Sequence, residues 1–254
     1  MNAQKVMAYA VDPNGQSMVR AGGIAAFILV IGWFLTSALY TGVGFLPTGI
    51  ETGARLGYYA PHLTEWWAIL GLMVFTDFVY LVIMLALYVV LEKVDRNLML
   101  LCVMSKVLFV VLDLAVLWPY KAALFTLAST YTATVTDAQR AALASAAVIP
   151  FAVLDSILPT IYSIVLPSLG TLFASLVMLK GVFSKRTAYL GIVTAVTGFI
   201  AVADPLMGAF GKMHYINALL AIGWYLLVGW RLYRLGKGHA SKLSGRAAGV
   251  AAGL

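Results

Sequence analysis

Two long stretches without a charged residue constrain this chain more than any other feature of its sequence. Neither residues 21–50 nor residues 156–179 contain Asp, Glu, Lys or Arg. About 20 consecutive apolar helical residues cross the hydrocarbon core of a bilayer, so each stretch is long enough to span it. Of the 254 residues, 62% are hydrophobic and only 11% are charged, too few charges for the surface of a soluble domain. The sequence therefore predicts an all-α, polytopic integral membrane protein.

Hydrophobic blocks and turn signals predict six transmembrane helices. They form a domain over residues 20–236, between a cytoplasmic N-terminal segment (1–19) and a flexible cytoplasmic tail (237–254). Short polar links between several of the blocks predict antiparallel neighbouring helices. The expected spans are roughly 20–42, 66–91, 98–118, 159–181, 187–207 and 213–234.

The distribution of basic residues predicts the orientation. Of the 17 Lys and Arg residues, twelve fall on one side of the expected spans and four on the other, while Lys106 falls within a span. Cytoplasmic loops carry the excess of positive charge, so we expect both termini in the cytoplasm and a location in a bacterial inner membrane. The scatter of these residues over short loops also argues against a nucleic-acid partner.

The long connection 119–158 is expected to hold an additional helix outside the bilayer. Thr136 and Asp137 form an N-cap signal before an alanine-rich stretch, which Pro150 is expected to interrupt. Two placements stay open: a lid over the bundle, or a helix lying on the lipid headgroups. Pro159 and Pro167 predict an irregular entry into the fourth span.

Asp77 and Lys106 are ionisable residues inside predicted spans. At a helical rise of about 1.5 Å per residue, they lie about 16 and 18 Å from the outer ends of their helices. An unpaired charge at that depth costs at least about 3 kcal/mol, so we expect the two to form an ion pair. That pair could be an inert structural feature, or a gate or proton relay.

Three further carboxylates are expected near the outer half of the bundle. Asp113 lies seven residues beyond Lys106, too far for a direct bond, while Asp204 and Asp155 lie at a span end and a span entry. They have no basic partner among the spans, although Lys121, Arg140 and Lys212 in the expected outer loops could neutralise them. Carboxylates in such settings favour proton transfer or cation binding. Asp113 is the strongest candidate for a catalytic or ligand-binding residue.

Two histidines are weak candidates for a metal or haem site. His62, with Glu65 three residues later, and His214 both fall at the expected outer surface, where histidines without such a role are commoner. The sequence contains no phosphate-binding loop, HExxH or GxSxG motif. It therefore identifies no cofactor.

Much of the chain resembles a known group of proteins. The stretches "FTDFVYLVIMLALYVVLEKVDRN", "SLGTLFASLVMLKGVFSKRTAYLGIVTAVTGF" and "ALLAIGWYLLVGWRLYRLG", with the charged third span, carry the resemblance over about residues 66–236. They are similar to uncharacterised six-span bacterial membrane proteins defined only as a domain of unknown function. The resemblance implies the six-span architecture but no substrate and no functional residue.

Three functions remain open from the sequence. The first is an outward-facing acidic cavity that binds, and in one version transports, a small cationic or amphipathic ligand. Asp113, Asp204 and Asp155 would line this cavity above the Asp77–Lys106 pair. The second is a membrane-embedded enzyme that uses Asp113 as an acid or base on a lipid or isoprenoid substrate. The third is an accessory or assembly subunit. Membrane lipids are expected partners in each case.

Overall fold

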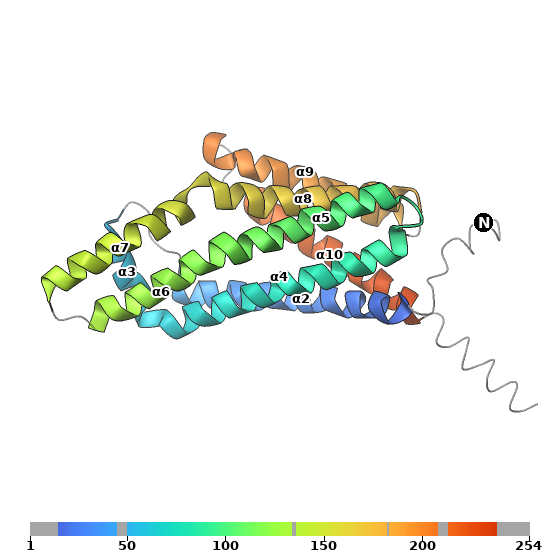
Figure 1. The fold of residues 1–254 in the computed structure, drawn as a ribbon. Coiled ribbons are helices and arrows are strands. Elements are labelled where there is room, and N and C mark those ends of the chain that lie inside the picture. Colours follow the sequence, from blue (N-terminus) through green and yellow to red (C-terminus); the bar gives the residue numbers. More distant parts are fainter. Residues whose placement is uncertain (1–14, 45–49, 134–135, 182, 208–212, 238–254) are drawn as a thin grey trace, which may run out of the picture. The chain divides into compact units, whose positions relative to one another are not determined.

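The computed structural model describes residues 15–44, 50–133, 136–181, 183–207 and 213–237, with the backbone alone for 204–207. These ranges contain helices and turns and no strand (Figure 1). The elements are α2 (Gln16–Val43), α3 (Thr52–Tyr59), η2 (Ala60–His62), α4 (Leu63–Leu91), α5 (Arg96–Leu112), η3 (Asp113–Leu117), α6 (Trp118–Ala133), α7 (Asp137–Asp155), α8 (Ile157–Leu179), α9 (Lys185–Met207) and α10 (Met213–Lys237). The predicted all-α class is confirmed.

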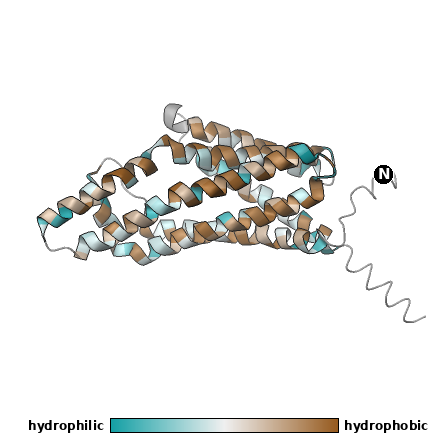
Figure 2. Cartoon of the chain, viewed as in Figure 1, coloured by the Kyte–Doolittle hydropathy of each residue, from teal (hydrophilic) through white to brown (hydrophobic). Residues whose placement is uncertain are grey.

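Six helical stretches are long and apolar enough to cross a membrane, as predicted. Three of them are much longer than a bilayer requires, at 40, 38 and 43 residues, because shorter helices extend the predicted spans. Figure 2 shows hydrophobic residues dominating these helices, with polar residues gathered near the start of α5 and of α7. The six stretches are Gln16–Val43, Thr52–Leu91, Arg96–Ala133, Asp137–Leu179, Lys185–Ala203 and Met213–Lys237.

The segment 119–158 differs from the expectation in two respects. Its first part is not a loop, because α6 extends the third span to Ala133. A helix does begin at Asp137, where the Thr136 side chain accepts a hydrogen bond from the Gln139 amide. Pro150 does not interrupt this helix but lies inside α7, since a helix can bend around a single missing hydrogen bond. The break falls at Ser156 instead, with Pro159 and Pro167 both inside α8.

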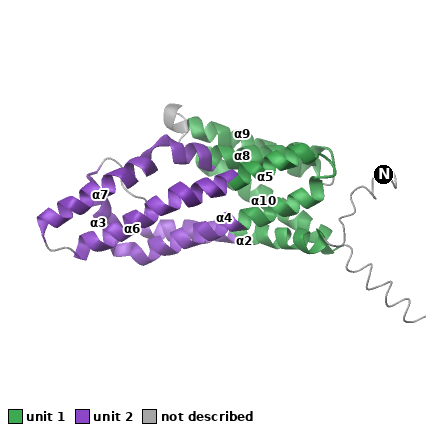
Figure 3. Ribbon diagram, viewed as in Figure 1, with its two compact units in different colours: residues 1–30, 79–107, 164–254 green, residues 31–78, 108–163 purple. Residues whose placement is uncertain are grey.

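The chain divides into two compact units (Figure 3). Unit 1 comprises Met1–Val30, Val79–Val107 and Ile164–Leu254, and unit 2 comprises Ile31–Phe78 and Leu108–Ser163. Of the predicted terminal segments 1–19 and 237–254, residues 1–14 and 238–254 lie outside the described residues.

Unit 1 is held together by close helix–helix packing. Helix α9 packs on α10, and α2 approaches α10 at Gly23, where an added Cβ would lie 2.5 Å from the Tyr233 amide nitrogen. Gly22, Gly170 and Gly191 also lie in close contact with neighbouring residues of unit 1. Small residues at these positions let the helix backbones approach each other.

Unit 2 is built around aromatic side chains. Helices α3, α6 and α7 pack on one another. The ring of Tyr59 lies 5.1 Å from Trp66, 5.2 Å from Phe125 and 6.3 Å from Phe151, measured between ring centroids. Each such pair contributes about 0.5–1.5 kcal/mol beyond the burial of its area. This aromatic cluster forms one wall of the candidate site.

Candidate functional site

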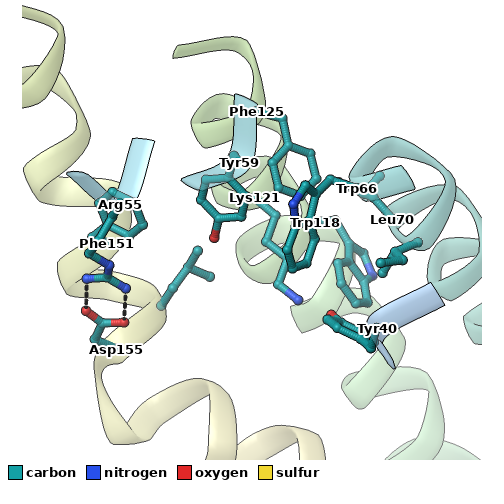
Figure 4. A pocket seen from close by; sticks show the side chains of 12 residues that line it. Tyr40, Arg55, Tyr59, Trp66, Leu70, Trp118, Lys121, Phe125, Phe151 and Asp155 are labelled. Atoms are coloured by element: carbon teal, nitrogen blue, oxygen red, sulfur yellow. Dashed lines mark hydrogen bonds and ion pairs between the residues drawn. The ribbon is translucent and has the colours of Figure 1, made fainter. Parts of the chain in front are cut away.

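A cavity of about 290 Å³ lies within unit 2 (Figure 4). On the volume of liquid water, about 30 Å³ per molecule, this is space for roughly ten water molecules or a small organic ligand. Six aromatic side chains dominate its lining, and we call it the aromatic cavity. The lining residues are Tyr40, Arg55, Tyr59, Trp66, Ile69, Leu70, Trp118, Lys121, Phe125, Phe151, Leu154 and Asp155.

One end of the aromatic cavity is closed by an ion pair between α3 and α7. Two guanidinium nitrogens of Arg55 donate to the two carboxylate oxygens of Asp155 at 2.6 and 2.9 Å. The guanidinium carbon also lies 3.8 Å from the centroid of the Phe151 ring. Arg55 thus combines a bidentate bond with a stacked aromatic face, which a lysine could not reproduce.

A second basic residue of the lining, Lys121 on α6, has no such partner. Its ammonium nitrogen lies 5.0 Å from the ring centroid of Trp118. Among the described residues, no carboxylate lies within ion-pair distance of this nitrogen. In Figure 4 the ammonium end of Lys121 points away from the Arg55–Asp155 pair, with Tyr59 between them. Among the described residues, the Lys121 ammonium of the aromatic cavity therefore has no ion-pair partner in direct contact.

Two more N–H donors of the lining lack acceptors. Nε1 of Trp66 and Nε of Arg55 are buried and have no hydrogen-bond partner in the described part of the chain. The lining carboxylate, Asp155, already accepts both of its hydrogen bonds from Arg55. The described carboxylate of the lining is therefore already paired, whereas its second basic residue, Lys121, is not in a direct ion pair.

Asp77 and Asp113 are both buried in unit 2, with 4% and 3% of their surface exposed. Oδ2 of Asp77 accepts a hydrogen bond of 2.7 Å from Nε1 of Trp118, which also lines the aromatic cavity. Oδ1 of Asp113 has no hydrogen-bond partner among the described residues. Buried polar atoms are normally paired, so an orphaned carboxylate oxygen marks Asp113 as a functional candidate.

Asp113 begins a short π-helix, η3, inside the third apolar stretch. The amide of Trp118 donates to the carbonyl of Asp113, five residues earlier instead of four. This wider turn brings residues i and i+5 toward the same side of the helix, and such turns are common at functional sites. Asp113 and Trp118, at the two ends of this turn, are both buried in unit 2.

Lys106 is buried in unit 1, with 1% of its surface exposed. Its ammonium nitrogen donates to the Tyr225 hydroxyl at 3.0 Å and lies 4.8 Å from the centroid of the Tyr80 ring. Asp77 belongs to the other unit, so the Asp77–Lys106 ion pair stays a prediction. Each of the two residues has a hydrogen-bond partner within its own unit.

The remaining predicted site residues, Asp204, His62 and His214, are not part of the aromatic cavity as described. The side chain of Asp204 lies outside the described residues. His62 lies 3.8 Å from Glu65, measured between Nδ1 and Oε1, and His214 contacts the ring of Tyr215. In the described part of the chain, no group of three His, Cys, Asp or Glu residues could hold a metal ion.

The aromatic cavity differs from the acidic cavity expected from the sequence. Of the predicted carboxylates, only Asp155 appears among its described lining residues, and that carboxylate is already paired. Arg55, Lys121 and the aromatic residues were not predicted as site residues. Arg55 and Asp155 are 100 positions apart, and their pairing has no local signal. One sequence signal did point to the tryptophans: aromatic residues are enriched at the membrane interfaces and therefore mark the ends of spans.

Comparison with family models, with curated proteins and with solved structures found no match to this chain. The resemblance to the six-span family over residues 66–236 therefore stays a prediction. The candidate site rests on the geometry of unit 2 alone.

Proposed function

We propose that this protein is a multi-pass bacterial inner-membrane protein with both termini in the cytoplasm. Its surface supports insertion, because Met104, Leu158 and Leu219 leave 65%, 65% and 67% of their surface exposed, and lipid would cover them. The twelve-to-four distribution of Lys and Arg supports the orientation.

Cysteine labelling in intact cells tests this orientation. The chain contains a single cysteine, Cys102, and it is buried, so an introduced thiol gives a clean signal. In a Cys102→Ala background we expect Lys93→Cys, between α4 and α5, to be protected from a membrane-impermeant maleimide. We expect Asp137→Cys, at the start of α7, to react with it. The opposite labelling pattern would invert the orientation.

We further propose that unit 2 binds an amphipathic ligand with an anionic head group. The observation that carries this proposal is the Lys121 ammonium, which lies among aromatic side chains and has no direct ion-pair partner among the described residues. A carboxylate or phosphate group would form a direct ion pair with this ammonium. The aromatic walls would bury the apolar part of the same ligand. A cationic ligand fits less well, because it would be repelled by Lys121.

Binding of three probes with the same ten-carbon chain to the purified protein in nanodiscs tests this preference. The probes are decanoate, decanol and decyltrimethylammonium, measured by calorimetry against empty nanodiscs. We expect decanoate to bind most tightly, because only decanoate supplies an anion to Lys121. Tighter binding of decyltrimethylammonium than of decanoate would refute the anionic ligand.

Two variants locate the binding site. Lys121→Met keeps the length of the side chain but removes its charge, and should weaken decanoate binding about 10- to 100-fold, the usual effect of losing a charged hydrogen bond. Lys185→Met removes an exposed charge at the start of α9, in unit 1, and should leave binding unchanged. Equal effects of the two variants would show that decanoate responds to net charge and not to the aromatic cavity.

A second candidate function, acid–base catalysis on a lipid or isoprenoid substrate, is favoured by the orphaned oxygen of Asp113. A buried carboxyl group with a free oxygen can exchange a proton with a substrate. Incubation of the protein with total membrane lipids, followed by mass spectrometry, tests this function. Products that form with the natural protein and not with Asp113→Asn would support an enzyme.

A further inference from the structure

Trp118 connects the aromatic cavity to the buried carboxyl groups of unit 2. Its ring lines the aromatic cavity and lies 5.0 Å from the Lys121 ammonium, while its Nε1 donates to Asp77. The same residue closes the π-turn that begins at Asp113. A ligand bound beside Lys121 would therefore lie one side chain away from these carboxyl groups.

The charged and polar groups around Asp113 come from three helices. Asp77 on α4 and Lys121 on α6 both act electrostatically on the Asp113 carboxyl. On α8, the buried hydroxyl of Tyr162 interacts electrostatically with both carboxyl groups. Lys121 is thus the one cation that acts on Asp113 among the described residues, and Asp77 is a competing negative charge.

This arrangement links anion binding to proton binding. The single positive charge of Lys121 can stabilise the ionised form of one of the two carboxyl groups, Asp77 or Asp113, but not of both at once. An anion bound to Lys121 would remove that compensation and leave the carboxylate buried next to a new negative charge. Protonation of the carboxylate restores the balance, because a buried charge without a partner is costly.

We propose that the aromatic cavity binds its anionic ligand together with one proton, which the Asp77–Asp113 pair takes up when the ligand neutralises Lys121. This inference rests on the proposed function, since it needs an anion in the aromatic cavity. It adds a proton-binding site to that function. By linkage, ligand affinity rises as pH falls, by up to about tenfold per pH unit for one coupled proton.

Calorimetry with decanoate measures the coupling directly. Titrations in two buffers with different enthalpies of ionisation give the number of protons taken up per bound decanoate. Because a bilayer raises the pKa of a carboxylic acid, the same titrations are run on empty nanodiscs at each pH, and the proton uptake by lipid-bound decanoate is subtracted. We expect an uptake between zero and one proton that varies with pH, with affinity increasing toward lower pH.

Three substitutions then show which carboxyl group takes up the proton. Asp113→Asn should still bind decanoate but lose both the proton uptake and the pH dependence of affinity. Asp77→Asn, which keeps an acceptor for Trp118, should reduce the uptake and serves as the second variant if Asp113→Asn does not fold. Asp137→Asn removes an exposed carboxylate at the start of α7 and should keep both properties.

The possible outcomes separate the two proposals. If the natural protein does not bind decanoate, the proposed function fails and this inference fails with it. Binding of decanoate with no proton uptake at any pH would overturn the inference alone. An uptake that persists unchanged in both Asp113→Asn and Asp77→Asn would also overturn it.

Discussion

The indole nitrogen of Trp118 donates a hydrogen bond of 2.7 Å to the buried carboxyl group of Asp77. The donor lines the aromatic cavity and the acceptor has 4% of its surface exposed. One residue therefore serves both as a wall of the candidate site and as the partner of a buried polar group. Changes at Trp118 should affect stability and ligand binding together.

The Trp118–Asp77 bond should be visible as a coupling between two substitutions. Trp118→Phe removes the donor and leaves a buried carboxyl oxygen unpaired, which should lower the free energy of unfolding by about 1–3 kcal/mol. Asp77→Leu removes the acceptor. The double variant should lose at least about 1 kcal/mol less than the sum of the single losses, as measured by denaturant unfolding in micelles.

A matched control for this cycle lies on the same helix as Asp77. Trp67 on α4 is 44% exposed, and Trp67→Phe should change stability by no more than about 0.5 kcal/mol. Strict additivity of Trp118→Phe and Asp77→Leu would mean that the hydrogen bond contributes nothing to stability.

The Arg55–Asp155 pair should be sensitive to a substitution that keeps its charge. Arg55→Lys retains one positive charge but loses the bidentate bond and the stacking on Phe151. The Asp155 side chain is 54% exposed, so solvent weakens the pair and the expected loss is only about 1 kcal/mol. Thermal unfolding of the variant measures it.

Arg186→Lys is the control for Arg55, because it makes the same substitution at an exposed position of α9. It should leave the melting temperature almost unchanged. Equal changes in melting temperature for the two variants would show that the bidentate bond of Arg55 does not contribute to stability.

Features set by local sequence could be predicted here, whereas features set by tertiary packing could not. The hydrophobic blocks predicted six apolar helices, and Thr136 predicted the start of α7, because hydropathy and capping act within a few residues. The effect of Pro150 on its helix could not be predicted, because a proline can either end a helix or bend it, depending on the residues packed around it.

The candidate site could be predicted only in part, because most of its contacts depend on tertiary packing. The cost of a charge inside an apolar helix singled out Asp113, and the structure leaves its Oδ1 unpaired. The partner of Asp155 lies 100 residues away, and only the packing of α3 on α7 shows that it is Arg55. A π-turn at Asp113 also leaves no hydropathy signal, because it changes the register of the helix and not its composition.

The turn between α4 and α5 should show a pH-dependent contribution to stability. Asp95 accepts a hydrogen bond of 2.9 Å from Lys180 and another from the Leu98 amide, and these bonds hold the pKa of Asp95 below its ordinary value of 3.8. A lowered pKa in the folded state stabilises the protein above pH 3.8, and this stabilisation is lost as the pH falls below that value.

Asp95→Asn tests this pH dependence, because asparagine can still cap α5 but cannot form the ion pair. The variant should melt about 1–3 °C below the natural protein at pH 7, a small shift typical of an exposed pair, and the difference should shrink toward pH 3. Glu92→Gln removes a charge from the same turn and should show no such dependence. A difference that grows as the pH falls would contradict the assigned sign.

The buried amine of Lys106 leads to the last prediction. Its partner in unit 1 is the Tyr225 hydroxyl, which offers a hydrogen bond but no negative charge. Lys106→Met has a similar volume and removes the cost of burying an amine, so it should be neutral or stabilising. Tyr225→Phe removes the hydroxyl and should cost about 1–3 kcal/mol, and adding Lys106→Met should recover part of that loss.

The pair Lys237 and Tyr233 is the control for this cycle, because it repeats the contact at an exposed lysine. The Lys237 ammonium lies 4.7 Å from the centroid of the Tyr233 ring. Lys237→Met and Tyr233→Phe should each have small, additive effects, since water solvates that ammonium in either case. A loss of more than about 3 kcal/mol on Lys106→Met would mean that a buried charge partner had been removed, as expected for the Asp77–Lys106 ion pair predicted from the sequence.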